Sequence, residues 1–391
     1  MSAIRSVTRP SRRECLQGAV ALAAAALASR TGVRAQAVGM VRARDVAGRT
    51  VSLPAPARRI VLSSPMNLDL LTFVHPDPIG LLAGWPGLNA SSNADQLEAM
   101  RRHYPGIDDV PVIGRVNLDS AAAEQLIGMA PDLVVLNLWD IAGRAADPDG
   151  HPLVRTLNEG GIPVVIVDTF QDPLAHTAPS LRALGRLLGT DDRVERFLAF
   201  YRDRLDRVAA RIAQAGDALH RPSVFLHAHA AGPVCCFTPG TGAFDAFIRL
   251  AGGWNIAAEV LSTPTGQLSI EQVIARRPEV YVATAGYTRD AGTGYSLGRD
   301  VTADTAEPGF AALLARPELA VLDAVASGNA HGLWHDFTHS PLHLVAIEVM
   351  ARWFHPERFA DIDPAETLAE INRTFLTVPV EGTFWLDQQR S

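Results

Sequence analysis

Histidines are the residues of this sequence whose type and spacing could bind a metal. Four of them recur at every fourth position near the end of the chain: His331, His335, His339 and His343. On one continuous helix this spacing would place four imidazoles on one face, as in a helical metal site. Gly332 and the Ser340-Pro341 pair interrupt such a helix, because serine caps a helix and proline suits its first position. We therefore expect a loop that carries His335 and His339, followed by a helix that contains only His343.

A second pair of histidines, His227 and His229, falls in the β-rich run SVFLHAH, where alternate side chains share one face of a strand. A buried, hydrogen-bonded imidazole is the commoner role of any single histidine. For contact with a metal or a metal chelate, His335 is the first candidate and His229 the second. The candidate metal ligands are His335 and His339. A hydrolytic metal held by these two and Asp336 is the remote alternative. Neither an HExxH motif nor a nucleophile elbow occurs, so we expect no catalytic residues and no enzyme activity.

Aromatic and arginine side chains supply the other candidate ligand contacts. In α/β sheets, binding groups lie on loops beyond the carboxyl ends of strands. The further candidates are Trp85, Arg115, Trp139, Tyr287, Arg289 and Trp334. Aromatic rings suit flat ligands, and an arginine could neutralise an anionic one. Ordinary packing is the alternative role for each ring. The motif TPGTG at 238–242 lacks the lysine of a phosphate loop, and we expect it to turn into a helix whose N-terminus faces a ligand cleft.

Two stretches that would position these residues are near copies of each other: EQLIGMAPDLVVL at 124–136 and EQVIARRPEVYVA at 271–283. Each pattern is typical of a short amphipathic helix, a proline and a buried strand. Strands and helices alternate up to about residue 172 and again after Pro222, which predicts mainly parallel sheets covered by helices on both faces. Between these regions, the apolar residues of 191–216 recur at helical spacing, and a helix of that length spans ~36 Å.

The expected fold class is therefore α/β, with two similar α/β lobes, mainly parallel sheets, one long rigid helix joining the lobes, and a ligand cleft between them. The expected boundaries are 38–188 for the N-terminal lobe, 189–218 for the linking helix and 219–391 for the C-terminal lobe.

Residues 1–37 are expected to be an export signal of the twin-arginine type. Arg12 and Arg13 precede the apolar segment Gly18–Ala28, and Ala35-Gln36-Ala37 supplies a small-residue cleavage site. The apolar segment is too short to span a membrane, so a periplasmic protein that is not membrane-embedded is expected. The signal carries six arginines and one glutamate, and its removal changes the formal net charge from −7 to −12. So acidic a protein is a poor partner for nucleic acid or anionic lipid, and we expect a monomer.

Two adjacent cysteines, Cys235 and Cys236, remain after that removal. Neighbouring Cα atoms lie ~3.8 Å apart, which is below the usual range for a disulfide. Two small buried thiols are therefore expected in preference to a vicinal disulfide.

The sequence resembles the periplasmic substrate-binding proteins of ABC importers for iron–siderophore complexes, cobalamin and haem. The resemblance covers nearly all of the chain after the signal. Besides the first repeat copy, it rests on DVAGRTVSLPAPARRIVLSS at 45–64, FDAFIRLAGGWNIAAEV at 244–260, GQLSIEQVIARRPEVYVATAG at 266–286 and SPLHLVAIEVMARWFHPERFADIDPAETLAEINRTFL at 340–376. It implies two α/β lobes bridged by a rigid helix, a ligand held between them, limited hinge motion and no catalysis.

The resemblance also implies a role for the repeated glutamates. In similar proteins a surface glutamate on each lobe docks on arginines of the permease dimer, and the matching positions here are Glu124 and Glu271. Two acidic points at a fixed separation would register a two-lobed protein on a two-fold partner. The alternative is that each glutamate stabilises the N-terminus of its own helix.

The leading hypothesis is a periplasmic solute-binding component of an ABC importer, which binds a ferric-siderophore-type iron complex and delivers it to an inner-membrane permease. No intrinsic cofactor is expected. The alternatives are a haem- or cobalamin-type chelate with a histidine or tyrosine near the metal, and a bare Zn²⁺ or Mn²⁺ ion held by histidines.

Overall fold

The computed structural model describes residues 40–87, 101–113, 120–141, 148–232, 235–286 and 294–389, without the side chains of 120–122. Residues Val41–Ser391 form one compact unit. The expected export signal at 1–37 lies outside the described residues. Within the described part of the chain, every helix is too short or too polar to cross a bilayer.

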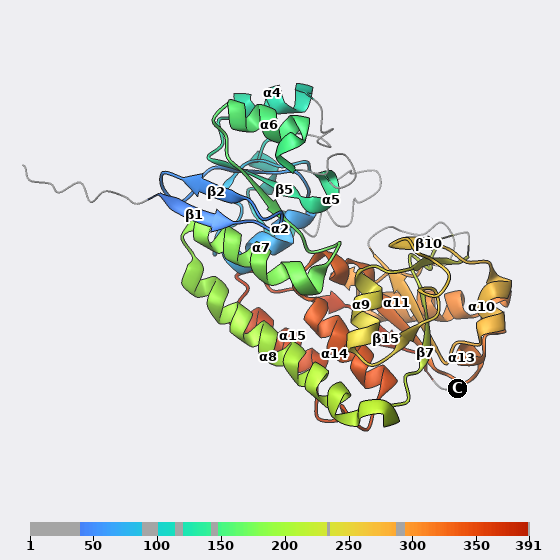
Figure 1. The fold of residues 1–391 in the computed structure, drawn as a ribbon. Coiled ribbons are helices and arrows are strands. Elements are labelled where there is room, and N and C mark those ends of the chain that lie inside the picture. Colours follow the sequence, from blue (N-terminus) through green and yellow to red (C-terminus); the bar gives the residue numbers. More distant parts are fainter. Residues whose placement is uncertain are drawn as a thin grey trace, which may run out of the picture. The chain divides into compact units, whose positions relative to one another are not determined.

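The first sheet has four parallel strands in the spatial order β4-β3-β5-β6 (Figure 1). They are β3 (Ile60–Leu62), β4 (Leu82–Gly84), β5 (Leu133–Asn137) and β6 (Val164–Val167), preceded by the antiparallel hairpin of β1 (Val41–Arg44) and β2 (Thr50–Leu53). Successive side chains of a strand point to opposite faces. In β5, Leu133 and Val135 accordingly join one hydrophobic cluster, while Val134 and Leu136 join a second.

Because both faces of this sheet are apolar, helices cover both. The helices α2 (Met66–Val74) and α7 (Pro173–Leu188) contribute to the first cluster, and α4 (Ser120–Gly128) and α6 (Pro152–Glu159) to the second. The short helix α5 (Leu138–Ile141) follows β5 directly. The buried runs in the sequence therefore form a parallel sheet covered on both sides, as predicted.

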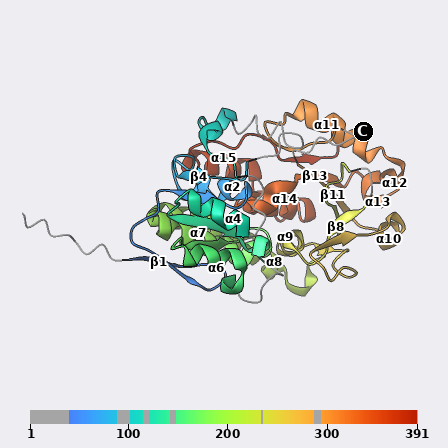
Figure 2. The ribbon, with the colours of Figure 1, turned by 90° about the horizontal axis from the view of Figure 1, so that it is seen from above.

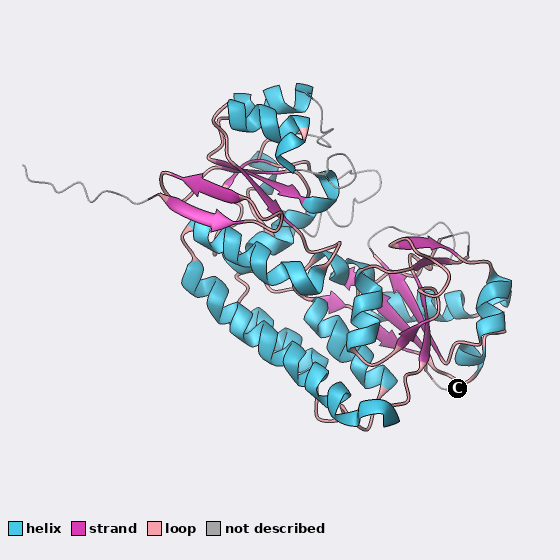
Figure 3. Cartoon of the chain, viewed as in Figure 1, coloured by secondary structure: helices cyan, strands magenta, loops and turns pink. Residues whose placement is uncertain are grey.

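The second sheet, whose strands are drawn as magenta arrows in Figure 3, has the spatial order β15-β13-β11-β7-β9. Its strands are β7 (Ser223–His227), β9 (Trp254–Asn255), β11 (Val280–Ala285), β13 (Ala330–Trp334) and β15 (Trp385–Asp387). All neighbours are parallel except β15, which runs antiparallel to β13. Two short antiparallel pairs accompany it: β8 (Phe237–Pro239) with β10 (Thr265–Gln267), and β12 (Gly298–Arg299) with β14 (Gly382–Thr383).

Helices and 3₁₀ turns connect and cover this second sheet. They are α9 (Ala243–Leu250), α10 (Ile270–Arg276), α11 (Ala303–Leu314), α12 (Pro317–Ala320), α13 (Asp323–Ala326), the 3₁₀ helix η4 (His335–His339), α14 (His343–Phe354) and α15 (Pro364–Thr374).

One long helix, α8 (Asp191–Ala215), contacts elements that belong to both sheets (Figure 2). The Phe197 ring packs on Phe73 of α2, with centroids 4.4 Å apart. One turn further, the Tyr201 hydroxyl lies 2.6 Å from His343 Nε2 of α14. The predicted α/β class, with mainly parallel sheets and a long joining helix, is confirmed.

Two local predictions differ from the structure. Helix α14 begins at His343, because residues 340–342 form a turn in which Ser340 Oγ accepts a hydrogen bond from the Leu342 amide at 3.3 Å. Strand β7 ends at His227, so His229 does not share a strand face with it. The Ala228 amide donates to Phe237 O at 2.8 Å, and His229 adopts φ 50°, which turns the chain away from the sheet.

Candidate functional site

A cavity of about 650 Å³ lies beyond the carboxyl ends of strands from both sheets. Trp139 follows β5, Phe170 follows β6, His229 follows β7, and His335 and His339 follow β13. The start of α9 adds Gly242, Ala243 and Phe244, so this helix start faces the cavity as predicted. The volume falls in the range of small-molecule sites.

Aromatic rings form much of the cavity wall. Trp139 remains 57% exposed and meets Phe170 edge-on, with ring centroids 5.2 Å apart. Phe170 in turn stacks on His339 at 4.7 Å. Phe237 and Phe244, which follow β7 in the sequence, complete the aromatic lining. Flat apolar surfaces of this kind suit a ligand with rings or a chelate with apolar faces.

Three histidines from two loops gather at one end of the cavity. The rings of His229 and His335 lie with centroids 3.7 Å apart, and those of His335 and His339 6.2 Å apart. The Thr284 hydroxyl accepts a hydrogen bond from the His229 amide at 3.0 Å and lies 2.9 Å from His335 Nδ1. Thr284, in the central strand β11, therefore links the two loops that carry the histidines.

Burial makes these imidazoles neutral at neutral pH. It lowers the pKa of His229. It also lowers the pKa of His335 well below the usual value, and repulsion from positive charge on His229 and His339 lowers the pKa of His335 further. Burial, followed by repulsion from His229, lowers the pKa of His339 to about 4. His339 Nδ1 is buried and has no hydrogen-bond partner among the described residues. The cluster can thus offer uncharged nitrogen donors to a ligand or a metal centre.

The carboxyl group of the cavity is Asp336. Burial and, to a lesser degree, the negative charge of Asp69 raise its pKa to about 7, against the opposing effect of the positive charge of Arg299. Arg299 Nη2 forms an ion pair with Asp69 Oδ1 at 2.7 Å, which joins β12 to α2. Asp336 therefore changes charge near neutral pH, and it does so close to the Arg299–Asp69 ion pair that joins β12 to α2.

The structure brings together four of the candidate residues from the sequence: Trp139, His229, His335 and His339 all line the cavity. Trp85 and Trp334 are only 2% and 1% exposed, lie in the main hydrophobic core and do not line this cavity. Arg115, Tyr287 and Arg289 lie outside the described residues.

The two candidate docking glutamates are exposed on corresponding helices. Glu271 lies in the first turn of α10, whose N-terminus carries a capping box made by Ser269 and Gln272. Hydrogen bonds from Ser269 and from its own backbone amide lower the pKa of Glu271. Glu124 is the fifth residue of α4, which has no acidic residue in its first turn. Stabilisation of a helix N-terminus therefore accounts for Glu271 but not for Glu124.

Phe170, Phe237 and Phe244 are cavity residues that the sequence did not single out. Phe170 follows a strand by three residues, so the loop rule used for the tryptophans could have found it. Phe237 and Phe244 follow the loop after β7, and no periodic signal distinguishes them from core residues.

The structure corrects the expectation for the cysteines. Cys235 and Cys236 form a disulfide, with their Cα atoms 3.1 Å apart, immediately before β8. The Cα separation lies even further below the usual range, so that range did not exclude a disulfide between adjacent cysteines.

Comparisons with known proteins agree with this arrangement. Residues 77–333 match the family described as periplasmic binding protein. The TroA-like periplasmic binding protein FepB of Veillonella parvula is 23% identical, with a TM-score of 0.77 over 89% of this chain and 100% of that one. Helicobacter pylori CeuE, solved as a Ni-His complex, is 16% identical, with a TM-score of 0.59 over 87% and 96%. A periplasmic haem-binding protein of Pseudomonas aeruginosa is 19% identical, with a TM-score of 0.53 over 85% and 99%. A search of curated proteins finds no match.

Proposed function

We propose, from the premise that the chain belongs to the periplasmic binding protein family, that it is the solute-binding component of an ABC importer and captures a ferric-siderophore-type iron complex. The family implies a periplasmic location, a permease partner and a small-molecule ligand, and its members bind substrates and do not transform them. The lobe boundaries 38–188 and 219–391, with the linking segment 189–218, and export through a twin-arginine signal belong to this proposal.

The observation that carries the ligand class is an aromatic cavity that contains neutral imidazoles. A siderophore surrounds its iron with its own oxygen donors and presents organic rings and chains outward. Trp139, Phe170, Phe237 and Phe244 offer faces for those groups. In a ferric hydroxamate the three hydroxamate anions balance the iron charge, so a wall of uncharged histidines accepts such a complex without burying an unpaired charge.

A haem- or cobalamin-type chelate is the second candidate. It is favoured by His339 Nδ1, which is buried without a partner among the described residues and could approach an open metal position. A bare Zn²⁺ or Mn²⁺ ion needs three or four protein ligands. The described residues hold no group of three His, Cys, Asp or Glu side chains arranged for a metal. A chelate that brings its own donors therefore suits the site better. The same observation weighs against a hydrolytic metal at His335, Asp336 and His339.

Delivery would use the two exposed glutamates. Glu124 and Glu271 lie on α4 and α10, each of which leads into a strand of a different sheet. A pair of acidic points presented by two equivalent helices fits a two-fold partner that carries arginines.

The test is a fluorescence titration of the metal-free protein with a ferric hydroxamate, a ferric catecholate, haem, cobalamin and free Zn²⁺. Trp139 should report a chelate that enters the cavity, because its half-exposed ring stands on the wall. We expect quenching by one ferric siderophore at micromolar or lower concentration, with Zn²⁺ silent. The matched control is Trp139→Phe, which should remove most of the quenching while calorimetry still detects binding.

Two outcomes would contradict this proposal. Tight Zn²⁺ binding that His335→Ala abolishes, with all chelates silent, would make the histidines a metal-ion site. Binding of haem alone would transfer the proposal to the second candidate.

A further inference from the structure

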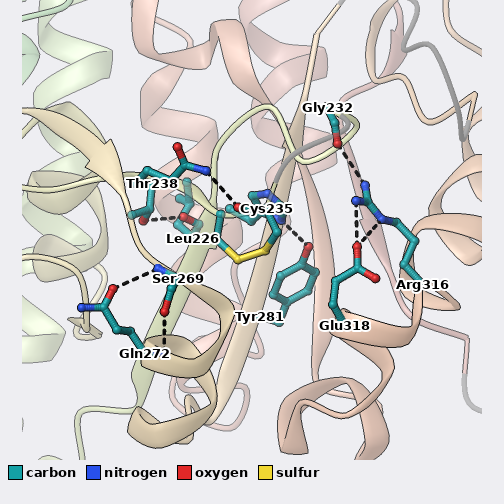
Figure 4. Close-up of a disulfide and its surroundings, with 12 residues drawn as sticks. Leu226, Gly232, Cys235, Thr238, Ser269, Gln272, Tyr281, Arg316 and Glu318 are labelled. Carbon is teal, nitrogen blue, oxygen red and sulfur yellow. Dashed lines mark hydrogen bonds and ion pairs between the residues drawn. A yellow bond between two sulfur atoms is a disulfide. The ribbon is translucent and has the colours of Figure 1, made fainter.

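Figure 4 shows the Cys235–Cys236 disulfide and the residues around it. Cys236 is fully buried in the main hydrophobic core, and Cys235 packs against that core while half-buried. Immediately after them comes β8, which supplies Phe237 and Pro239 to the cavity. The disulfide thus lies at the start of a strand whose side chains contact the ligand space.

Both cysteine carbonyl groups are tied to the neighbouring strand. Gln267 Nε2 donates to Cys235 O at 2.9 Å, and the Leu268 amide donates to Cys236 O at 3.1 Å. These contacts continue the pairing of β8 with β10, in which Pro239 lies opposite Thr265, another cavity residue. The two cysteines therefore contact both strands of this wall: they directly precede β8, and their carbonyl groups accept hydrogen bonds from residues at the end of β10.

A chain of contacts runs from β8 to the histidines. Phe237 O accepts the Ala228 amide at 2.8 Å, and the Phe237 ring stacks on His229 with centroids 6.3 Å apart. His229 then connects to His335 through Thr284 and through direct ring contact.

The residues that follow His229 are also held by a contact outside the cavity. Arg316 Nη1 donates to Gly232 O at 3.0 Å, and Arg316 pairs with Glu318 at 2.7 Å; both contacts are visible in Figure 4. Gly232, three residues after His229, is therefore restrained by a contact outside the cavity.

We propose that the Cys235–Cys236 disulfide is a positioning element of the ligand site, which holds Phe237 and His229 in the cavity wall and weakens ligand capture when it is opened. A bond between adjacent side chains removes backbone and side-chain freedom at the start of β8. Without it, part of the binding free energy must order this wall when the ligand arrives. The effect on affinity rests on the proposed function, whereas the effect on the wall does not.

The experiment compares the oxidised protein with protein reduced by a small-molecule dithiol. The S–S bond breaks as the dithiol supplies two electrons and two protons, giving two cysteine thiols and a cyclic disulfide of the reagent. Alkylation and mass measurement count the thiols formed. The first readout is hydrogen exchange of the Ala228 and His229 amides, which donate to Phe237 O at 2.8 Å and to Thr284 Oγ1 at 3.0 Å. The second readout is titration with the ferric hydroxamate, ferric catecholate and haem probes.

On reduction we expect these two amides to exchange about tenfold faster, because the wall that holds their acceptors loosens, while the Ile162 amide, which donates to Leu157 O beside the first sheet, keeps its exchange rate. The affinity for the probe that binds should fall about three- to tenfold, the size of effect expected when a binding wall loses pre-organisation. The variant Cys235→Ala/Cys236→Ala should resemble the reduced protein and show no response to the dithiol. That control separates opening of this bond from any other effect of the reagent.

Unchanged exchange of both amides after both thiols have been counted would overturn the proposal, and so would faster exchange with unchanged probe affinity. If none of the probes binds even the oxidised protein, the proposed ligand class fails, while the exchange of the Ala228 and His229 amides still decides whether the disulfide positions the wall.

Discussion

His229 and His335 lie with their imidazole centroids 3.7 Å apart, at an interplanar angle of 31°, although one follows β7 and the other follows β13. Thr284 of the intervening strand β11 contacts both residues. The pair forms only because β7, β11 and β13 are parallel neighbours whose carboxyl ends open on the same edge. Two imidazoles this close favour the neutral state, since protonation of one raises the energy of protonating the other.

Buried histidines make the fold sensitive to acid. Burial lowers the pKa values of His227, His339 and His343 to about 3, 4 and 3. The unfolded chain takes up protons at these residues below its ordinary pKa near 6.5, before the folded protein does. The free energy of unfolding therefore falls as pH falls, by up to about 2 kcal/mol per histidine between pH 7 and pH 5. Asp336, whose pKa is raised, opposes this trend.

Urea unfolding at pH 7, 6 and 5 measures the loss. His343→Gln, whose amide can still pair with the Tyr201 hydroxyl, should show a smaller decrease than the wild type. Equal decreases in the two proteins would contradict the assignment of this effect to His343.

Glu348 should destabilise the fold at alkaline pH. Its side chain is fully buried in α14, and Arg204 Nη1 lies 4.0 Å from its carboxyl group. Burial raises the pKa of Glu348 to about 7. Above that pH the folded protein holds a buried carboxylate, whereas the unfolded chain is ionised from a pH near 4.5 upward. Stability that is present at pH 5 is therefore lost as the pH rises toward 8, by about 2 kcal/mol.

The variant Glu348→Gln removes this titration. We expect it to gain stability relative to the wild type between pH 5 and pH 8, measured as the change in Tm at each pH. Glu370→Gln is the matched control, since Glu370 pairs with the same arginine at 2.6 Å but is partly exposed. A parallel pH dependence for all three proteins would refute the prediction.

Trp139 should contribute to ligand affinity without contributing much to stability. Its ring is 57% exposed and its closest aromatic neighbour is Phe170. Trp139→Ala should weaken binding of the chelate by about 1–2 kcal/mol, while the free energy of unfolding changes by about 0.5 kcal/mol or less. Calorimetric titration and urea unfolding measure the two quantities. Trp254→Ala, at a 41% exposed ring outside the cavity lining, should leave affinity unchanged. Equal affinity losses in both variants would assign the effect to something other than the cavity.

Charge reversal at the two glutamates should separate delivery from capture. Glu124→Arg/Glu271→Arg should reduce ligand-stimulated ATP hydrolysis by the reconstituted importer at least about tenfold, because each acidic point would meet a like charge on the permease. Chelate affinity should remain at the wild-type value, since neither residue lines the cavity. Glu259→Arg/Glu357→Arg, at two other exposed glutamates, makes the same change in net charge and is the control. Normal stimulation by the double variant would exclude these two positions as the docking points.

Local sequence patterns were sufficient to predict most helices and strands and their order along the chain. Apolar runs such as those that became β5 and β11 are long enough and β-branched enough to be buried strands, and the spacing of Val194, Phe197, Tyr201 and Val208 specified one face of α8. These signals are local, because periodicity and propensity act over a few residues. The repeat of helix, proline and strand was visible for the same reason.

Which side chains come into contact depends on the tertiary structure. It placed His229 on His335 and buried Trp85 and Trp334, although all four residues follow or end strands in the sequence. It also brought Phe237 and Phe244 into the cavity and joined Cys235 to Cys236. A loop residue reaches a cavity or the core according to the direction in which its backbone leaves the sheet, as the φ of 50° at His229 shows. That direction is set by partners such as Phe237 O and Thr284 Oγ1, which lie distant in sequence or across a turn, and no local pattern encodes it.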